Sequence, residues 1–526
     1  MEKILDELEP VLRYYYAPER IESQIAKDMA ALREVYINGN EEDKKKWEET
    51  ILKRIRQNPD CKSRVFFYSY LLTVMEKEEC LQELLELLVT LTEQQMSWTM
   101  RYHIYWQIAS AFFEKASLQT ADNRQLMARL YYHIIQDMKQ EMGVGLKQIP
   151  AAERNKNFVI VITNQFLNLT HGPTKTALDR CQILKQKMKK EIMLINTAEL
   201  LVGDNKNPWY ERKIADYEKG YLQYESIVYE DLNIPFFQCE QNMPNRKEMQ
   251  DIINVVRDLK PIYIVNIGGT SILTDLCNEL VPTVTIGTVP SDLSTTAGEL
   301  QVIGRRLRPE DLDVLKELGQ EEKNVIEGTF TSSLPVRKEK VSRRELHAEE
   351  GDFLCVVVGG RLNQEITDEF VEMICGIKEP RIKFIFIGRF QKGYEYYSQK
   401  YKDFREKAIN IGEIMNVLGY LEQCDLYVNP IRTGGGTSVI EAMHEGLPVV
   451  TTDFGDGALG VGKNFFVKDY QEMAEEIVHY AMDRTYYEEK SQKAKLRAAE
   501  MLDTSKAFCK IMEEAERRLG LRETGE

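Results

Sequence analysis

The spacing of hydrophobic residues changes twice along the chain and divides it into three parts. Up to residue 148 apolar residues recur at intervals of three and four, as in CLQELLELLVTLTEQQ, a spacing typical of amphipathic helices. From residue 157 the pattern changes to short apolar runs, such as NFVIVIT and PIYIVNIGG, separated by helical stretches. After a polar segment at 331–351 the same alternation restarts with DFLCVVVGGR. Short strands that alternate with helices predict parallel sheets with crossover helices.

We therefore predict an α/β chain with an all-helical domain in front. The predicted boundaries are 1–148 for the helical domain, 149–335 for a first doubly wound, Rossmann-like domain, and 336–526 for a second one that ends in helices. The polar segment 331–351 is interpreted as the interdomain linker. The helical part shows no repeat of fixed period, although its short paired helices leave a solenoid arrangement open.

Charge and composition narrow the classes of partner. Across 526 residues, 69 Lys and Arg stand against 84 Asp and Glu, for a net charge of -15, so we expect no nucleic-acid partner. The nine cysteines are scattered singly, with no histidine at ligand spacing, and we expect no metal site. The N-terminus MEKILDELEP lacks the features of a secretory signal, and no apolar run reaches the roughly 20 residues of a membrane span. We expect a cytoplasmic protein.

Candidate binding chemistry gathers in the stretch IRTGGGTSVIEAMHEG, residues 431–446. Three glycines follow the strand DLYVNP and lead into a helix, at the sheet edge where doubly wound folds bind ligands. Glycine lets a ligand approach the backbone, and a helix N-terminus favours phosphate. The pattern predicts a phosphate or diphosphate site. The alternative is a flexible loop capped by Thr437, before a helix that ends at Gly446.

Two charged residues support the binding interpretation. Glu441 lies one turn into the same helix, where a carboxylate can accept hydrogen bonds from a ribose. Arg361 follows the strand CVVVGG on the same sheet edge, where a guanidinium can bind phosphate with two hydrogen bonds. A solvated helix glutamate and a surface arginine are the alternatives.

These motifs carry a resemblance to a known family. SRRELHAEEGDFLCVVVGGRL resembles the opening of the nucleotide-sugar-binding half of a GT-B glycosyltransferase, and CDLYVNPIRTGGGTSVIEAMHEGLPVVTTDFGD resembles the donor-site signature of the group 1, family 4-like branch. The resemblance covers about residues 155–515 and is most specific over 351–456. It implies the GT-B fold, in which two Rossmann-like domains face each other and the C-terminal one binds the nucleotide-sugar.

The resemblance also implies roles for individual residues. The donor, most consistently a UDP-sugar, would bind with its diphosphate on Gly435, Gly436, Thr437 and Ser438 and with its ribose on Glu441. Arg361 would pair with the phosphate charge, and Met415 and Asn416 would hold the base. GT-B enzymes generally hold no bound cofactor or metal, so the nucleotide-sugar is expected as a co-substrate. Two departures stand out: Thr433 replaces a second acid eight residues before the helix glutamate, and LNQEITDEF lacks a lysine that often follows the arginine.

The acceptor side is predicted in the first α/β domain. His171 lies in the loop NLTHGPTKTALD after the first strand, where an imidazole near neutrality could remove a proton from an acceptor or contact the donor sugar. An N-cap cluster with Thr170 and Thr174 is the alternative. Gly172 belongs to the same loop, and Gly268 and Gly269 form a second glycine turn at a strand end.

The predicted function is transfer of a hexose or N-acetylhexosamine from a nucleotide-sugar to an acceptor, with His171 and Arg361 as candidate catalytic residues. A helical domain before a GT-B core is similar to bacterial cytoplasmic protein glucosyltransferases and to O-linked N-acetylglucosamine transferases, so a protein or peptide acceptor is the working hypothesis. One alternative is a catalytically silent GT-B protein that supports an active partner, motivated by Thr433 and the missing lysine. Another is a glycan or lipid-linked sugar as acceptor.

Overall fold

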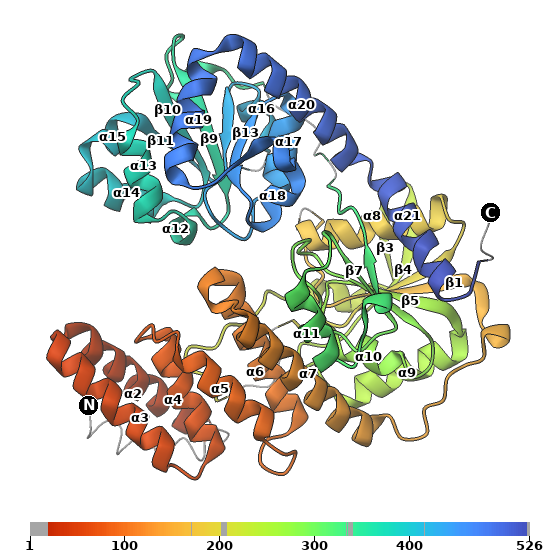
Figure 1. Cartoon of the computed structure of the whole chain (residues 1–526). Helices are drawn as coiled ribbons and strands as arrows, with labels where there is room; N and C mark the ends of the chain where they lie inside the picture. The colour runs from red at the N-terminus through yellow and green to blue at the C-terminus, as the bar shows by residue number, and fades with distance from the viewer. Residues whose placement is uncertain are drawn as a thin grey trace.

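The chain consists of an N-terminal group of helices followed by two α/β units. The computed structural model describes residues 19–169, 171–200, 208–332, 334, 340–414 and 416–522. In Figure 1 the helices (red to orange) lie beside the first α/β unit (yellow to green), and the second unit (cyan to blue) lies above both.

Amphipathic sequences form the N-terminal helices, as their spacing predicts. Their bounds are α2 Glu19–Asn38, α3 Glu41–Gln57, α4 Cys61–Thr73, α5 Cys80–Thr90, α6 Trp98–Glu114 and α7 Ala121–Met142. Several begin at a side chain that accepts a backbone N–H of the first turn: Asn40 for α3, Asp60 for α4, Ser97 for α6 and Thr120 for α7. Such caps satisfy donors that the helix itself leaves unpaired.

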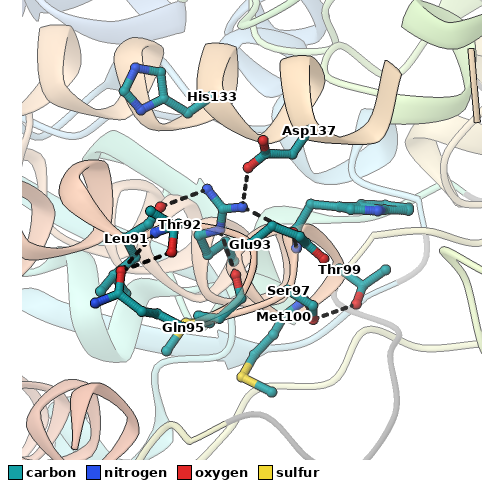
Figure 2. Close-up of polar contacts among 12 residues, drawn as sticks. Leu91, Thr92, Glu93, Gln95, Ser97, Thr99, Met100, His133 and Asp137 are labelled. Carbon is teal, nitrogen blue, oxygen red and sulfur yellow. Dashed lines mark hydrogen bonds and ion pairs between the residues drawn. The ribbon is translucent and has the colours of Figure 1, made fainter. Parts of the chain in front are cut away.

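A fully buried arginine fixes α6 against α5 and α7. Arg101 donates from Nε to the Met96 carbonyl at 3.0 Å and from Nη1 to the Leu91 carbonyl at 3.2 Å, and its Nη2 contacts the carboxylates of Glu93 and Asp137 (Figure 2). A buried charge is tolerated when it is paired and hydrogen-bonded in this way. The orientation of α6 is therefore strongly constrained, which matters because α6 reaches the cavities described below.

The first sheet has eight strands in the order β3-β4-β2-β1-β5-β6-β7-β8. Neighbouring strands are parallel except β3 and β4, which form an antiparallel pair at one edge. The strand bounds are β1 Asn155–Thr163, β2 Glu191–Asn196, β3 Ser226–Tyr229, β4 Leu232–Gln238, β5 Pro261–Ile267, β6 Thr283–Ile286, β7 Leu300–Ile303 and β8 Val325–Glu327. Its helices are α8 Gly172–Gln186, α9 Arg246–Leu259, α10 Ile272–Cys277 and α11 Pro309–Glu317.

The N-terminal helices and one face of the first sheet share a single hydrophobic core. Along β1, Ile160 and Ile162 belong to the cluster that also contains buried residues of α3 to α7, whereas Val159 and Val161 belong to the cluster on the opposite face. This alternation follows from the period of two along a strand. The helical region is thus packed into the sheet rather than tethered to it.

Two buried carboxylates add directional contacts to this apolar interface. Glu199 accepts hydrogen bonds from the Tyr102 hydroxyl of α6 at 3.0 Å and from the Ile272 N–H, at the start of α10, at 3.1 Å. Asp275 accepts from the Tyr131 hydroxyl of α7 at 2.7 Å. Burial raises the pKa of both carboxyls, that of Asp275 to about 6. The tyrosine hydroxyl is one of several hydrogen-bond donors that compensate the burial of each carboxylate.

The second sheet has six parallel strands in the order β11-β10-β9-β12-β13-β14. Its strands are β9 Phe353–Gly359, β10 Ile382–Gly388, β11 Ala408–Gly412, β12 Leu426–Val428, β13 Val449–Thr452 and β14 Phe466–Val467. Its helices are α12 Leu362–Glu365, α13 Asp368–Gly376, α14 Gln391–Lys400, α15 Lys402–Lys407, α16 Leu418–Leu421, α17 Gly436–Glu445, α18 Gly455–Val461, α19 Tyr470–Met482 and α20 Arg484–Leu502. Short 3-10 helices occur at Ala116–Leu118, Ala151–Glu153, Lys219–Gln223, Glu322–Asn324, Arg343–Leu346 and Lys463–Phe465.

The last helix returns to the first sheet. α21, Thr504–Arg518, contributes Phe508 and Met512 to the core on the face of the first sheet that α8 covers, and Figure 1 shows α20 and α21 descending from the second unit to the first. The segment in which the chain leaves the first sheet after β8 contacts the junction of α20 and α21, where the chain returns. The Ser332 N–H donates to the Met501 carbonyl at 3.1 Å, and the Thr504 hydroxyl donates to the Ser332 carbonyl at 3.4 Å.

The predicted fold class is confirmed, with differences in detail. Both sheets are parallel in their centres and the N-terminal part is helical. The hydrophobic pattern did not identify β3, β4, β7 or β8, because three of them have only three or four residues and Pro235 interrupts the fourth. The boundaries at 148/149 and 335/336 stay predictions. Among the helices described, none is long and apolar enough to cross a membrane.

We expect Tyr131→Phe to lower the free energy of unfolding by about 1–3 kcal/mol, because it leaves the buried carboxyl of Asp275 with one donor fewer. The urea or thermal midpoint of the full chain measures the loss. Tyr132→Phe is the matched control, since it lies next to Tyr131 on α7 and its hydroxyl makes no hydrogen bond within the described part of the chain. Equal midpoints for the two variants would show that the Tyr131 hydroxyl does not support the interface.

Candidate functional site

A first cavity of about 820 Å³ lies between the facing edges of the two sheets. Its walls come from the ends of β9 and β10 and the segments after β9, β11, β12 and β13 of the second sheet, and from the end of β5 and the segments after β6, β7 and β8 of the first. The loops after β9 and β12 flank the point where the strand order of the second sheet reverses. Ligands of doubly wound folds bind at such a switch point.

The glycine loop between β12 and α17 has a backbone that only glycine suits. Gly435 has φ +98°, and a Cβ there would lie 2.6 Å from Arg432 Nη2 and 2.8 Å from Asn429 Oδ1. α17 begins at the next residue, Gly436, and its first N–H groups lack partners within the helix. Gly435, Gly436, Thr437 and Ser438 all line the first cavity. This brings together an accessible backbone and a helix N-terminus, which together suit an anionic phosphate.

The glycine loop rests on a buried arginine. Arg432 is 5% exposed and donates from Nε to Asn429 Oδ1, from Nη1 to Glu365 Oε2 and from Nη2 to the Val358 carbonyl, each at 2.8 Å. Its Nη2 also reaches the Tyr427 hydroxyl at 3.2 Å. Arg432 thus joins the loop after β9 to the loop after β12.

The same network holds Ser438 and Arg361. The Tyr427 hydroxyl lies 2.7 Å from Ser438 Oγ at the start of α17. Arg361 donates from Nε and Nη2 to Glu365 Oε1, at 3.2 and 3.0 Å, while the other oxygen of Glu365 accepts from Arg432. Both Arg361 and Glu365 line the first cavity, so the cation predicted to bind phosphate is already oriented by a carboxylate.

Glu441 faces the first cavity as a nearly buried carboxyl. It is 9% exposed, and burial raises its pKa to about 7, while the charge of Lys175 on α8 partly opposes the shift. Within the described residues it accepts no hydrogen bond. A carboxyl of this kind has acceptor capacity available for hydroxyl groups of a ligand.

A second acidic group bridges the two units. Asp456, in the first turn of α18, accepts a hydrogen bond from the Ser291 hydroxyl of the first unit at 3.0 Å. Burial raises the pKa of Asp456 to about 6. This contact closes one side of the first cavity, which Asp456 also lines.

A second cavity of about 490 Å³ lies between α6, α7 and the edge of the first sheet. Aromatic side chains of α6 form one wall: Tyr105, Trp106, Phe112 and Phe113. The opposite wall contains His171, Gly268 and Gly269. The two cavities adjoin, because they share the lining residues Phe113, Pro173, Gly287 and Thr288.

His171 is the N-cap residue of α8, but its ring does not cap the helix. No side-chain capping bond forms, and Nδ1 instead lies 3.0 Å from the Thr174 hydroxyl, which accepts the Leu167 N–H at 2.8 Å. Burial lowers the pKa of His171, with Asp216 opposing. This shift favours the neutral form of the imidazole, which lines the second cavity.

The glycine turn after β5 is held by a residue that the motif analysis did not select. Gly268 and Gly269 have φ values of +146° and +87°. The side-chain amide of Asn164, which follows β1, donates to the carbonyls of Gly268 and Thr270 at 3.2 and 3.3 Å. The loops after β1 and β5 thus meet at the reversal of strand order in the first sheet.

Not every predicted site residue lies at a cavity. Asn416 accepts the Leu418 N–H at 3.2 Å and is not among the lining residues, whereas its neighbours Glu413, Ile414 and Val417 are. Gly172 is exposed and lines neither cavity. Met415 and Thr170 lie outside the described residues. The roles of all these positions stay predictions.

The sequence analysis did not select several residues that line the cavities, among them Asn164, Glu365, Arg432, Asp456 and Phe113. Glu365, Arg432 and Asp456 stand within or beside the motifs quoted above, so their polarity was a usable signal. Nothing in the sequence distinguished Phe113, because an aromatic residue in an amphipathic helix is usually part of the hydrophobic core. In the part of the chain that the structure describes, no group of three or more His, Cys, Asp or Glu could hold a metal ion.

Comparisons with known proteins agree with this architecture. Residues 353–483 match the family model described as glycosyl transferases group 1. A search of curated proteins found no match.

Two crystal structures share the fold at low sequence identity. A glycosyltransferase from Rickettsia africae ESF-5 is 10% identical, with a TM-score of 0.50 over 69% of this chain and 99% of its own. A mutant of the O-GlcNAc transferase from Thermobaculum terrenum is 11% identical, with a TM-score of 0.51 over 98% of each chain. The second match extends over the helical region as well as both sheets. Residues 353–483 thus carry the match to glycosyl transferases group 1, and the chain as a whole has the GT-B fold.

Proposed function

We propose that the protein transfers a hexose or N-acetylhexosamine from UDP to an acceptor held in the second cavity. The observation that carries this proposal is the arrangement around the first cavity, where the N-terminus of α17, Arg361 and the unpaired carboxyl of Glu441 face one space. Helix N-terminus and guanidinium suit a diphosphate, and the carboxyl suits ribose hydroxyls. The choice of UDP rests on the resemblance of the sequence to GT-B donor sites.

The chemistry is a displacement at the anomeric carbon of the sugar. The bond from that carbon to the diphosphate oxygen breaks, a bond to the acceptor oxygen or nitrogen forms, and the acceptor loses a proton. Negative charge develops on the leaving UDP, where Arg361 and the α17 N-terminus stabilise it. His171 accepts the proton through Nε2, which requires the tautomer in which Nδ1 donates to the Thr174 hydroxyl.

The acceptor in this proposal is a protein or peptide segment that enters between α6 and the first sheet. The aromatic wall of the second cavity offers apolar surface, and His171 and the turn at Gly268 and Gly269 offer polar groups at its base. Since the cavities adjoin, an acceptor group there can reach the donor sugar. A glycan acceptor would use the same cavity, because aromatic rings also pack against sugar rings.

A silent GT-B protein is the second candidate function. Thr433, a residue without charge, stands where many relatives carry an acid, and Glu365 partly neutralises Arg361. Such a protein would bind nucleotide without turning it over. Turnover of a UDP-sugar separates the two candidates.

UDP should bind in preference to GDP, ADP and dTDP, with an affinity that falls as the pH drops through 7. Glu441 has a raised pKa of about 7, so its carboxylate form is lost below that pH. Between pH 8 and 6 the loss should reach about tenfold for one ionisable acceptor. Calorimetry on wild type and Glu441→Gln measures it, and the difference between them cancels the titration of UDP itself. Parallel pH profiles would remove Glu441 from the site.

Gly435→Ala should weaken UDP binding at least tenfold. The added Cβ meets the Arg432 guanidinium and Asn429, at a φ of +98° that L residues rarely adopt, so the glycine loop must shift. Gly351→Ala is the control, because a Cβ there meets nothing within 4 Å and the residue lies outside both cavities. Unchanged UDP affinity in Gly435→Ala would mean that the nucleotide does not rest on this loop.

His171→Ala should lower kcat on the order of a hundredfold while leaving UDP affinity within twofold, as expected for loss of a general base. His479→Ala, on α19 and away from both cavities, is the matched control. Steady-state assays with a UDP-sugar, in water and with peptide acceptors, give kcat. A wild-type kcat in His171→Ala contradicts the assignment, and wild-type protein that binds UDP without any turnover supports the silent alternative.

A further inference from the structure

We propose that Phe113 of the helical region is a positioning residue for Arg361, so that the helices complete the donor site of the second unit. This inference rests on the proposed function, because it takes Arg361 as the ligand of the diphosphate. The observation behind it is a direct contact: the guanidinium carbon of Arg361 lies over the Phe113 ring, 4.0 Å from its centroid. In the sequence, the two residues stand on either side of the segment that forms the whole first sheet.

The contact leaves Arg361 with one face and one edge occupied. Phe113 covers a face of the planar guanidinium, and Glu365 accepts from its Nε and Nη2 edge. Nη1 donates to no residue that the structure describes. Stacking does not consume the N–H groups of a guanidinium, since these lie in its plane. The remaining edge is therefore held ready for an anion at the first cavity, which Arg361 lines.

The position of Phe113 suits contact with Arg361 rather than packing in a hydrophobic core. Its side chain is 45% exposed, an unusual state for phenylalanine, and it lies at the end of α6 where both cavities meet. α6 itself is fixed by the buried Arg101 and by Tyr102, so the ring is presented from a constrained element. An aromatic ring on a constrained helix can restrict a long flexible side chain that would otherwise sample many rotamers.

The consequence for binding is preorganisation. Without the ring, Arg361 keeps its hydrogen bonds to Glu365 but loses the surface that orients the plane of its guanidinium. Binding of the diphosphate must then also order this side chain, which costs free energy. Because Phe113 also lines the second cavity, an acceptor there contacts the residue that orients the donor's phosphate ligand. The two substrates are thereby coupled through one side chain, and such coupling is reciprocal.

The test compares Phe113→Leu with Phe113→Tyr in the full chain, using UDP as the probe. Loss of the ring should weaken UDP binding and raise the donor KM roughly three- to tenfold, the range expected for one cation–π contact, while Phe113→Tyr restores wild-type values. Tyr396→Leu is the matched control. It removes another exposed ring that lies over a cation, Lys400 at 5.5 Å, outside both cavities.

A double-mutant cycle distinguishes the positioning role of Phe113 from a purely structural role. In an Arg361→Ala background, Phe113→Leu should cause no further loss of UDP affinity, because the ring acts only through the guanidinium. Additive losses would overturn the inference, as would equal UDP affinity in wild type and Phe113→Leu. Wild-type protein that binds no nucleoside diphosphate would overturn the proposed function itself, and the positioning role with it.

Discussion

The glycine loop between β12 and α17 depends on the compensation of one buried charge. Arg432 is removed from water immediately before this loop, and it donates hydrogen bonds to Glu365 and Val358, which line the first cavity, and to Asn429 and Tyr427, which do not. Since an uncompensated guanidinium in this position would cost several kcal/mol, the loops after β9 and β12 must stay in register for the fold to persist. The geometry of the proposed phosphate site is thus maintained by the same contacts that join the loops after β9 and β12.

The position of the helical region is also constrained by buried polar contacts, in this case with the first sheet. Its core continues into the first sheet, and Tyr102 and Tyr131 each donate one hydrogen bond to the buried carboxyls of Glu199 and Asp275. Removing residues 1–148 would therefore expose apolar surface and take one hydrogen-bond donor from each of these carboxyls. Questions about the role of this region are better addressed with single substitutions than with truncation.

The sequence was informative where the structure is determined locally. The succession of strand, loop and helix identifies the glycine loop, Glu441 and Arg361, because all three are placed by residues within one turn or strand end of themselves. The sequence was uninformative where placement depends on distant segments. Phe113 meets Arg361 across more than two hundred residues, and Asp456 meets Ser291 across 165, so no pattern within either stretch reveals the contact. Asn416 shows that proximity to cavity residues in sequence does not fix a position at the cavity wall, and its predicted role stays a prediction.

The position of α21 has a consequence for motion. The chain passes from the first unit to the second after β8 and comes back at the junction of α20 and α21, and these two crossings are hydrogen-bonded at Ser332. Ser332 and Met501 also line the first cavity. Two adjacent connections behave as a hinge with one axis, which permits rotation and resists sliding or separation of the units. A rotation about this junction would change the distance between Arg361 of the second unit and Phe113 of the helical region, which are in contact in this structure.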